Sequence, residues 1–293
     1  MTKILLTGAT GFIGSGLVPK LESAGYSLKC LVRAASIDKA VQQLGENRCL
    51  EIPKTQEDLA MLLSTTKPDA VIHLASRFLS IHAPEQVDEL IESNITFPTH
   101  LLEAMKYAGV RHFLNTGTIF QSADGTLGTP FNLYAATKQA FEGILQHYVR
   151  NENFCVLTLR LADTFGMGDT RCKIVQLMIN AAMQKNTLAL SPGEQKISLT
   201  WVDDVQSGFV QGLEYLLAVK NSGHEVFGLC NPKLMTLRDL GKLVEVAVGH
   251  PANFQWGMRP YRQGEIMVPV LPKKLPGWEA KMDIKNGILH LIH

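Results

Sequence analysis

Short apolar runs alternate with longer, periodically apolar segments through the first half of the chain. The runs predict buried strands at 4–7, 28–32, 70–75, 112–115 and 156–161, and a weaker strand at 50–52. In the longer segments apolar residues recur about every 3.6 positions, which predicts helices over 14–24, 84–108 and 133–150 and a weaker one over 58–64. Strands that alternate with helices pair in parallel, and right-handed crossovers place helices on both faces. We therefore predict an α/β fold built on a doubly wound parallel sheet.

The pattern becomes less regular after position 161. Segment 162–169 contains glycines and predicts a loop, followed by helices over 173–183, 203–218 and 236–248 and a strand over 225–230. The tail beyond 248 is rich in proline but still carries Trp256, Tyr261 and Trp278, which a solvated linker would lack. It predicts a smaller, irregular C-terminal lobe packed against the sheet.

The composition indicates a globular protein, with 46% hydrophobic residues. The 28 Lys and Arg residues nearly balance the 27 Asp and Glu residues, so no nucleic acid partner is expected, because binding its backbone requires a basic face. No apolar stretch is long enough to span a bilayer or serve as a signal peptide, which predicts a cytoplasmic protein without a membrane partner. The five cysteines and nine histidines have no metal-ligand spacing, so no metal site is expected.

A glycine-rich turn follows the first predicted strand. Thr7-Gly8-Ala9-Thr10-Gly11-Phe12-Ile13-Gly14 has the spacing G-x-x-G-x-x-G, which departs from the G-x-G-x-x-G dinucleotide fingerprint. Its position between a strand and a helix nevertheless suits a dinucleotide, because glycine lets a pyrophosphate approach the N–H groups at the helix start. We expect a cofactor to contact Gly8, Thr10, Gly11, Phe12, Ile13 and Gly14.

The residue at the end of the second predicted strand distinguishes proteins that prefer NAD from those that prefer NADP. A carboxylate there binds the ribose 2′-hydroxyl, whereas an arginine accommodates a 2′-phosphate. Arg33 stands at this position, and no acidic residue follows before Asp38. We predict that NADP(H) is preferred through Arg33, with NAD(H) as the alternative cofactor and a solvated side chain as the alternative role of Arg33.

Tyr134 and Lys138 are four positions apart in a predicted helix, so they share one face. A nearby ammonium favours a phenolate, so we expect Lys138 to lower the pKa of Tyr134 and Tyr134 to transfer a proton to a substrate oxygen. Lys138 can also hold the ribose hydroxyls of the cofactor. A hydroxyl of Thr116 or Thr118, at the end of a predicted strand, can donate to the substrate carbonyl. An ordinary amphipathic helix is the alternative explanation of the Y-x-x-x-K spacing.

Other motifs match those of a known superfamily. His73-Leu74-Ala75-Ser76 resembles H-L-A-A, Phe165-Gly166-Met167-Gly168-Asp169 resembles Y-G-P-G-D, and Trp201-Val202-Asp203-Asp204-Val205 resembles Y-V-D-D-V. With the glycine turn and Y-x-x-x-K, the chain resembles the extended short-chain dehydrogenase/reductase superfamily, in its sugar-nucleotide branch. The resemblance implies a Rossmann fold, cofactor contacts by Leu74, Ala75, Asn94, Tyr134 and Lys138, catalysis by Thr116, Tyr134 and Lys138, and a substrate contact by Thr118.

The same resemblance implies how the chain is divided and assembled. Residues 1–164 and 198–230 would form the dinucleotide-binding domain, and residues 165–197 and 231–293 the substrate-binding lobe. Relatives pair the helices matching 84–108 and 133–150 across a dimer interface, which implies a homodimer.

The residues after Thr116 indicate the reaction class. Dehydratases of this branch carry an acid pair there, but Gly117 and Thr118 have no ionisable group, so dehydration is not expected. Segments 193–195, 262–267 and 275–278 resemble 4-ketoreductases that make dideoxyhexoses, the abequose and paratose synthases acting on CDP-linked 4-keto sugars being the nearest comparison. We predict NADPH-dependent reduction of a nucleotide-linked 4-keto-6-deoxy or 3,6-dideoxy hexose at its carbonyl carbon.

Arg262 is the predicted contact for the substrate diphosphate, because the matching arginine of related epimerases binds that group. A guanidinium can donate two parallel hydrogen bonds to phosphate oxygens. An ion pair with Glu265 is its alternative role. Two other functions stay open, an NAD-dependent sugar-nucleotide epimerase and a non-catalytic NADP-binding regulator. The carboxylate that such epimerases carry after the second strand is replaced here by Arg33, and retention of Tyr134 and Lys138 argues against the regulator.

Overall fold

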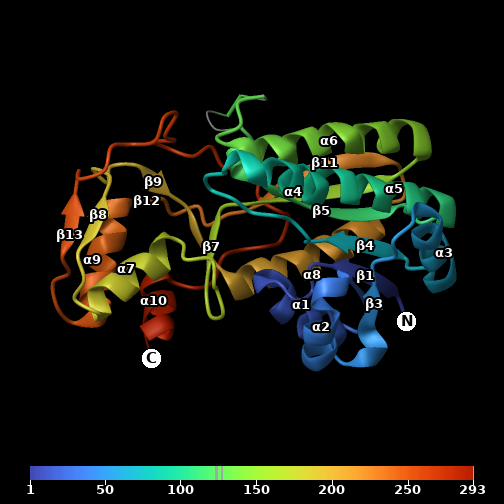
Figure 1. Ribbon diagram of the computed structural model, residues 1–293, viewed down its shortest axis with the longest axis horizontal. Helices are drawn as coiled ribbons and strands as arrows, with labels where there is room; N and C mark the ends of the chain where they lie inside the picture. The colour runs from blue at the N-terminus through green and yellow to red at the C-terminus, as the bar shows by residue number, and fades with distance from the viewer. Residues whose placement is uncertain (123–124, 127, 293) are drawn as a thin grey trace.

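Seven parallel strands form the central sheet of the protein. The computed structural model describes residues 1–122, 125–126 and 128–292 (Figure 1). The strand order is β11-β6-β5-β4-β1-β2-β3. The bounds of these strands are β1 (Lys3–Thr7), β2 (Ser27–Val32), β3 (Cys49–Glu51), β4 (Ala70–His73), β5 (His112–Thr118), β6 (Cys155–Leu161) and β11 (Gly223–Leu229). The order reverses between β1 and β4, where doubly wound sheets open a crevice at their carboxyl edge. The predicted fold class is confirmed.

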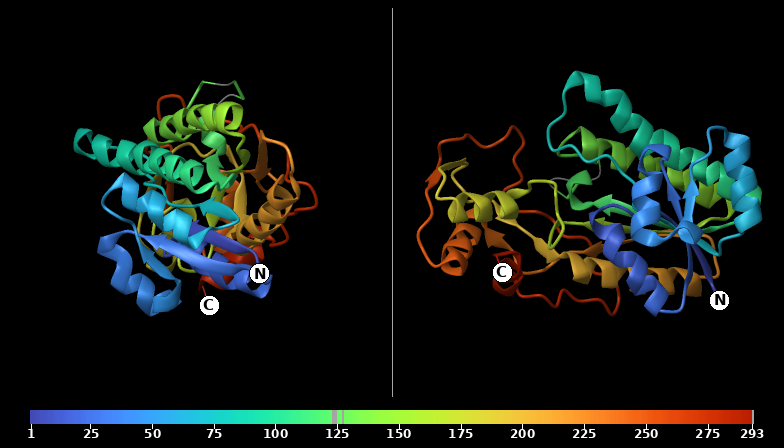
Figure 2. Two further views of the ribbon diagram at one scale, coloured as in Figure 1. Left: turned by 90° about the vertical axis from the view of Figure 1, so that its right-hand side faces the viewer. Right: turned by 60° about the horizontal axis from the view of Figure 1, so that its bottom comes forward.

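Helices cover both faces of the sheet (Figures 1 and 2). One face carries α1 (Phe12–Ser23), α2 (Ile37–Leu44) and α8 (Val202–Ala218), and the other carries α3 (Gln56–Thr66), α5 (Phe97–Ala108) and α6 (Leu133–Glu152). Ile4 and Leu6 pack with the first set and Leu5 with the second, because successive strand residues point to opposite faces. Helix α2 was not predicted; it has two turns and buries just Ala40 and Leu44. Three single turns, η1 (Ala34–Ser36), η2 (Glu46–Arg48) and η5 (Ile119–Gln121), connect these elements.

The helix predicted over 84–108 is interrupted in the structure. It consists of η3 (Pro84–Gln86), α4 (Val87–Ile91), the π-turn η4 (Glu92–Thr96) and α5. Pro98 has no N–H to bond the carbonyl of Asn94 four residues earlier, so the regular helical pattern cannot continue there. The π-turn buries the Asn94 side chain against the segment that follows β4.

A smaller lobe lies beside the sheet, at the left of Figure 1. It contains α7 (Ile174–Met183), α9 (Leu237–Val248), α10 (Ile284–Ile292) and the strand pairs β7 (Asp163–Phe165) with β10 (Leu199–Trp201), β8 (Leu188–Leu190) with β13 (Phe254–Trp256), and β9 (Lys196–Ile197) with β12 (Met235–Thr236). Two predictions were wrong here. Segment 162–169 is not purely a loop, because β7 pairs with β10. The tail is not irregular throughout, because Ile284 and Ile288 lie one turn apart and bury one face of α10.

The C-terminal tail is anchored to the apolar core of the central sheet. Trp278 is 2% exposed, and its Nε1 donates to the carbonyl of Asp204 at 2.8 Å. The Asp204 carboxylate accepts the main-chain N–H groups of Lys281 and Met282, each at 2.9 Å. Leu275 and Trp278 belong to the same apolar cluster as β1. The division into 1–164 with 198–230 and 165–197 with 231–293 stays a prediction. In the part of the chain that the structure describes, no helix is both long and apolar enough to cross a bilayer.

Candidate active site

The glycine turn forms a cradle at the end of β1. Gly8 has a φ of +75°, and a Cβ on Gly14 would lie 2.2 Å from the Gly8 carbonyl oxygen, so neither position tolerates a side chain. Among the described residues, no side chain caps α1 at Gly11. The first N–H groups of α1 are therefore oriented to bind an anion. The turn, which carries all six predicted cofactor residues from Gly8 to Gly14, fits the pyrophosphate of a dinucleotide.

The segment after β4 lies against this cradle. The N–H of Ala75 donates to the Thr7 hydroxyl at 3.2 Å, and a Cβ on Gly8 would lie 2.7 Å from the Ala75 nitrogen. Leu74 and Ala75 are thus brought to the glycine turn. Arg33 is exposed immediately after β2, the strand that pairs with β1 on the opposite side from β4. The candidate phosphate and ribose contacts therefore gather at one edge of the sheet.

Tyr134 and Lys138 lie in the first two turns of α6, whose start is fixed by a hydrogen bond from the Ala135 N–H to Asn132. Lys138 is 2% exposed; burial lowers its pKa to about 8, and the Glu142 carboxylate opposes this shift. Burial raises the pKa of Tyr134 to about 12, while a hydrogen bond with Ser76 and the charge of Arg171 act in the opposite direction. The prediction that Lys138 makes Tyr134 acidic was therefore wrong for this state, because desolvation of the phenolate outweighs the nearby charges.

Asn94 is fully engaged by protein groups. Its Oδ1 accepts the Arg77 N–H at 2.8 Å and the Ser76 hydroxyl at 3.0 Å. Its Nδ2 donates to the Arg77 carbonyl and to the Thr137 hydroxyl, each at 3.0 Å. An asparagine amide has two donors and two acceptor positions, and all four are occupied. The structure therefore gives Asn94 a positioning role between the loop after β4 and α6 rather than the predicted cofactor contact.

The two candidate threonines have different surroundings. Thr116 is half-buried, and its hydroxyl donates to the His73 carbonyl at 2.8 Å. Thr118 is 5% exposed; its hydroxyl accepts the Phe120 N–H at 3.3 Å and donates to the Leu161 carbonyl at 3.4 Å. Thr118 thus caps η5, and the structure does not support its predicted substrate contact. Thr116 can donate to a substrate after its O–H turns away from His73.

A cleft of about 650 Å³ lies between the sheet and the smaller lobe, with Tyr134 in its wall. The wall beside Tyr134 is apolar and consists of Phe78, Ile119, Phe120 and Phe131. Phe78 meets the Tyr134 ring edge-on, with ring centroids 5.0 Å apart. The rest of the lining carries five cations against two carboxylates: Arg171, Lys173, Lys196, Arg259 and Arg262 against Asp163 and Glu265. The cleft therefore combines apolar and cationic lining, and two of the cations, Arg171 and Lys173, lie near Tyr134 and Phe78.

Arg262, the predicted diphosphate contact, is exposed in this cationic part. Its main-chain N–H donates to Glu265 at 3.3 Å, but its guanidinium does not pair with that carboxylate. Arg171 pairs with Asp169 at 2.7 Å and Lys173 with Asp163 at 3.1 Å. Within the described ranges no ion pair involves Lys196, Arg259 or Arg262. These three cations favour an anionic group in the cleft.

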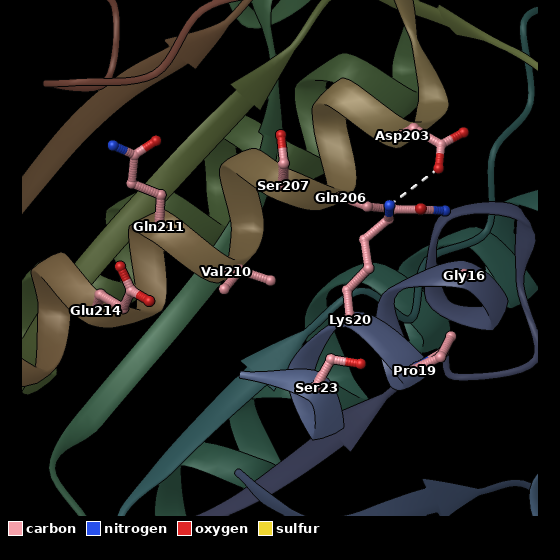
Figure 3. Close-up of a pocket in the computed structure, with 10 residues that line it drawn as sticks. All are labelled: Gly16, Pro19, Lys20, Ser23, Asp203, Gln206, Ser207, Val210, Gln211 and Glu214. Carbon is pink, nitrogen blue, oxygen red and sulfur yellow. Dashed lines mark ion pairs between the residues drawn. The ribbon is translucent and has the colours of Figure 1, made fainter. Parts of the chain in front are cut away.

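A second hollow lies between α1 and α8 (Figure 3). Lys20 of α1 and Asp203 of α8 form an ion pair of 3.0 Å across it. Gln206 packs over Gly16, where a Cβ would lie 2.3 Å from the Gln206 Nε2. These groups already satisfy one another, whereas Tyr134 and Arg262 line the other cleft. We therefore assign the chemistry to the cleft at Tyr134.

Sequence reasoning missed Ser76 and Phe78 at this site, and it placed Arg171 in a loop that could reach phosphates without giving it a role. The Arg171 guanidinium lies 4.5 Å from the Phe12 ring centroid and donates to the Thr164 carbonyl at 3.2 Å, so it links the glycine turn to the loop before α7. Ser76 had a detectable signal, because it replaces the second alanine of H-L-A-A. Phe78 reaches the site, and Arg171 reaches Phe12, through tertiary packing that no local sequence pattern indicates.

Comparisons with known proteins agree with this geometry. A model of the NAD dependent epimerase/dehydratase family matches residues 4–226. The CDP-abequose synthase of Yersinia pseudotuberculosis is 28% identical over 272 residues, 91% of this chain and 91% of that protein. The CDP-abequose synthase of Salmonella muenchen is 25% identical over 294 residues, 99% and 97% of the two chains. The UDP-glucuronic acid 4-epimerase from Bacillus cereus, solved with UDP-glucuronic acid and NAD, has the same fold, with a TM-score of 0.82 at 23% identity over 98% of this chain and 96% of that one.

Proposed function

Because the chain belongs to the NAD dependent epimerase/dehydratase family, we propose that it reduces the 4-keto group of a nucleotide-linked sugar with NADPH. Membership of this family makes it an NAD(P)-dependent enzyme of the extended short-chain dehydrogenase/reductase type. The proposed sugar is a 6-deoxyhexose or 3,6-dideoxyhexose. One observation carries this proposal: a single cleft is lined by Tyr134, by an apolar wall and by three cations that form no ion pair among the described residues. The similarity to CDP-abequose synthases over nearly the whole chain supports a CDP-linked substrate.

The apolar and the cationic lining residues suit different parts of such a substrate. Phe78, Ile119 and Phe120 offer apolar surface to the deoxygenated carbons of the sugar, which cannot satisfy buried polar groups. Arg259 and Arg262 offer guanidinium groups to the diphosphate, whose oxygens accept two parallel N–H bonds. This arrangement would place the sugar at Tyr134 and the nucleotide toward the smaller lobe.

The protonation states suit reduction. The pKa of Tyr134, raised to about 12, keeps the phenol protonated at neutral pH, so Tyr134 can donate a proton to the oxygen of the carbonyl being reduced. The pKa of Lys138, about 8, keeps its ammonium charged there, so it can hold the ribose hydroxyls of a cofactor. The bound nicotinamide would supply the hydride, with its pyrophosphate at Gly8, Gly11 and Gly14. Thr116 would donate the second hydrogen bond to the substrate oxygen.

The preference for NADP(H) rests on Arg33. An exposed guanidinium directly after β2 can pair with a 2′-phosphate, and a carboxylate that would select the ribose 2′-hydroxyl is missing from this position. Replacing Arg33 with Ala should raise the Kd of NADPH about ten-fold or more, the value of a charge-assisted hydrogen bond, and leave that of NADH nearly unchanged. Equal affinities for the two cofactors in the wild-type protein would remove this role.

The central test is turnover. A panel of CDP-, dTDP-, GDP- and UDP-linked 4-keto-6-deoxysugars would be screened by NADPH absorbance, with the product configuration determined by NMR. Tyr134→Phe should lower kcat about 10²- to 10⁴-fold and leave NADPH binding intact, because it removes one hydroxyl. Tyr261→Phe is the matched control, since Tyr261 also lines the cleft but its hydroxyl accepts the main-chain N–H of Glu194. Full activity of Tyr134→Phe would refute the proton-donor assignment.

The same panel distinguishes the proposed reductase from the second candidate function, an NAD-dependent epimerase. NAD that stays bound through gel filtration, with sugar epimerised and no net NADPH consumption, would identify an epimerase, the activity named for the Bacillus cereus protein. The homodimer expected through α5 and α6 and the cytoplasmic location stay predictions. Light scattering of the purified protein would test the first.

A further inference from the structure

Arg171 lies over the start of α1, although it belongs to the loop between β7 and α7. Its guanidinium carbon Cζ is 4.5 Å from the centroid of the Phe12 ring. Phe12 is the first residue of α1 and directly follows Gly11 of the glycine turn. The guanidinium therefore lies beside the helix end whose N–H groups can bind an anion.

One edge of this guanidinium is fixed by the protein. Its Nε and Nη2 donate to the two carboxylate oxygens of Asp169 at 2.7 and 2.8 Å, and Nη2 also donates to the Thr164 carbonyl at 3.2 Å. The Asp169 side chain is 7% exposed and that of Arg171 29% exposed, so the pair is only partly open to water. Because three N–H groups are bonded to two acceptor residues, the guanidinium keeps one orientation.

The remaining nitrogen of the guanidinium has no such partner. An arginine side chain has five N–H donors, and the two on Nη1 form no hydrogen bond within the described residues. Arg171 also lines the cleft at Tyr134. A role confined to fixing the loop would be complete with Asp169 and Thr164 and leaves the two Nη1 donors unexplained. They are available to a ligand that extends from the glycine turn into the cleft.

A dinucleotide with its pyrophosphate at the glycine turn and its nicotinamide at Tyr134 would follow this path. The pyrophosphate carries two negative charges, whereas the end of a helix supplies about half a positive charge. A further donor group beside the helix end would therefore add to what the N–H groups of α1 provide. Because Asp169 offsets the charge of Arg171, the added binding would come from directed N–H bonds rather than from net charge.

We propose that Arg171 binds the nicotinamide-side phosphate of the dinucleotide through Nη1, beside the N–H groups at the start of α1. This inference rests on the proposed function for the bound dinucleotide, but it does not depend on the ketosugar. It adds a side-chain contact to a pyrophosphate site that the glycine turn otherwise forms from its main chain. It also explains why the loop before α7 reaches the glycine turn.

The test compares three ligands by isothermal titration calorimetry of the full-length protein. NADPH and 2′-phospho-ADP-ribose contain the pyrophosphate, whereas adenosine 2′,5′-bisphosphate lacks the nicotinamide-side phosphate. Arg171→Ala should raise the Kd of the first two about ten-fold, the value of a charge-assisted hydrogen bond, and that of the third less than about two-fold. Arg171→Lys should recover little of this loss, because an ammonium paired with Asp169 cannot reproduce the guanidinium fork. If NADH is the preferred cofactor, the matching series is NADH, ADP-ribose and AMP.

Two further variants separate binding from folding. Arg150→Ala is the matched control, because it removes an arginine from the exposed last turn of α6, and it should leave all three Kd values unchanged. Arg171→Ala alone leaves the buried Asp169 carboxylate without its partner, which can disturb the loop. Asp169→Asn combined with Arg171→Ala removes both charges and should show the same selective loss of affinity.

Three results would overturn the inference. Equal losses for all three ligands would assign the effect to the adenosine half of the site or to the fold. A loss for NADPH alone would assign it to the nicotinamide, and an unchanged Kd of NADPH would leave Arg171 with a structural role. Lack of turnover on every ketosugar would count against the proposed function alone, and the binding series would still decide the role of Arg171.

Discussion

The buried ion pair between Glu142 and Arg160 offers a sharp test of how α6 is fixed on the sheet. Arg160 of β6 donates to the two Glu142 oxygens at 2.6 and 3.2 Å. Their side chains are 7% exposed for Glu142 and 13% for Arg160. Glu142 lies one turn beyond Lys138 on the buried face of α6. Replacing Glu142 with Gln keeps the shape of the side chain but removes the negative charge that balances Arg160 and Lys138.

The expected loss of stability follows from this burial. Removing one partner of a buried pair leaves the other charge without compensation, which typically costs about 3–5 kcal/mol. Glutamine can still accept one N–H, so we expect the lower end, about 3 kcal/mol. Glu152→Gln is the matched control, because Glu152 also forms an ion pair, with Lys106, but that pair is more exposed, at 24% for Glu152 and 39% for Lys106. It should change the free energy of unfolding very little.

The substitution should also act on Lys138. The Glu142 carboxylate raises the Lys138 pKa against the larger effect of burial, so without it the pKa should fall below about 8. The ammonium would then be lost at a lower pH, and the alkaline limb of kcat/KM should move toward neutrality. Urea denaturation followed by tryptophan fluorescence measures the stability, and a pH–rate profile measures the second effect. If Glu142→Gln unfolds at the same urea concentration as Glu152→Gln and keeps the wild-type pH profile, the reasoning is refuted.

Three further outcomes are expected. Gly14→Ala should abolish NADPH binding in a fluorescence titration, because its Cβ would lie 2.2 Å from the Gly8 carbonyl oxygen. Gly143→Ala in α6 is the control, because its Cβ meets no atom within 4 Å and the change should raise stability by up to about 1 kcal/mol. NADPH binding retained by Gly14→Ala would contradict the assignment of the pyrophosphate to the glycine turn. Burial lowers the pKa of His73 to about 3, so its contribution to stability is complete above the unfolded pKa of 6.5 and is lost as pH falls from there toward 3. Replacing His73 with Asn should flatten the dependence of unfolding free energy on pH in this window, and an unchanged slope would show that other groups cause it. Asp204→Ala should cost about 2–4 kcal/mol in chemical denaturation, because the main-chain N–H groups of Lys281 and Met282 lose their acceptor, while Trp278 keeps the main-chain carbonyl of residue 204; a change below about 0.5 kcal/mol would count against this anchor of the tail.

Local patterns were sufficient for the elements that build the sheet. Residues 4–6 are all apolar because both faces of β1 are covered, and the helix around Tyr134 and Lys138 has twenty residues with a capped start. The glycine turn was recognisable because its steric requirement is met within seven residues. The same sequence could not show the break at Asn94, which depends on Pro98 and on hydrogen bonds to the loop after β4.

The details of the site depended on contacts between distant segments. Ser76 and Asn94 are 18 positions apart, and Trp278 and Asp204 are 74 apart. Thr118 was given a substrate contact from its type and position, but burial and the cap of η5 occupy its hydroxyl. The pKa of Tyr134 was placed too low because spacing reveals the nearby lysine but not the desolvation of the phenol.

Helix α10 completes the apolar core of the smaller lobe, and the other residues of that core come earlier in the sequence. Its Gly287 packs so closely that a Cβ there would lie 2.9 Å from the Phe165 ring and 3.1 Å from the Trp201 ring. The sheet, which ends with β11, can assemble on the ribosome before α10 emerges from the exit tunnel. During that interval Phe165 and Trp201 lack the helix that packs against them. The apolar core of the smaller lobe therefore cannot be completed until the last helix of the chain has been synthesised, after every strand of the central sheet.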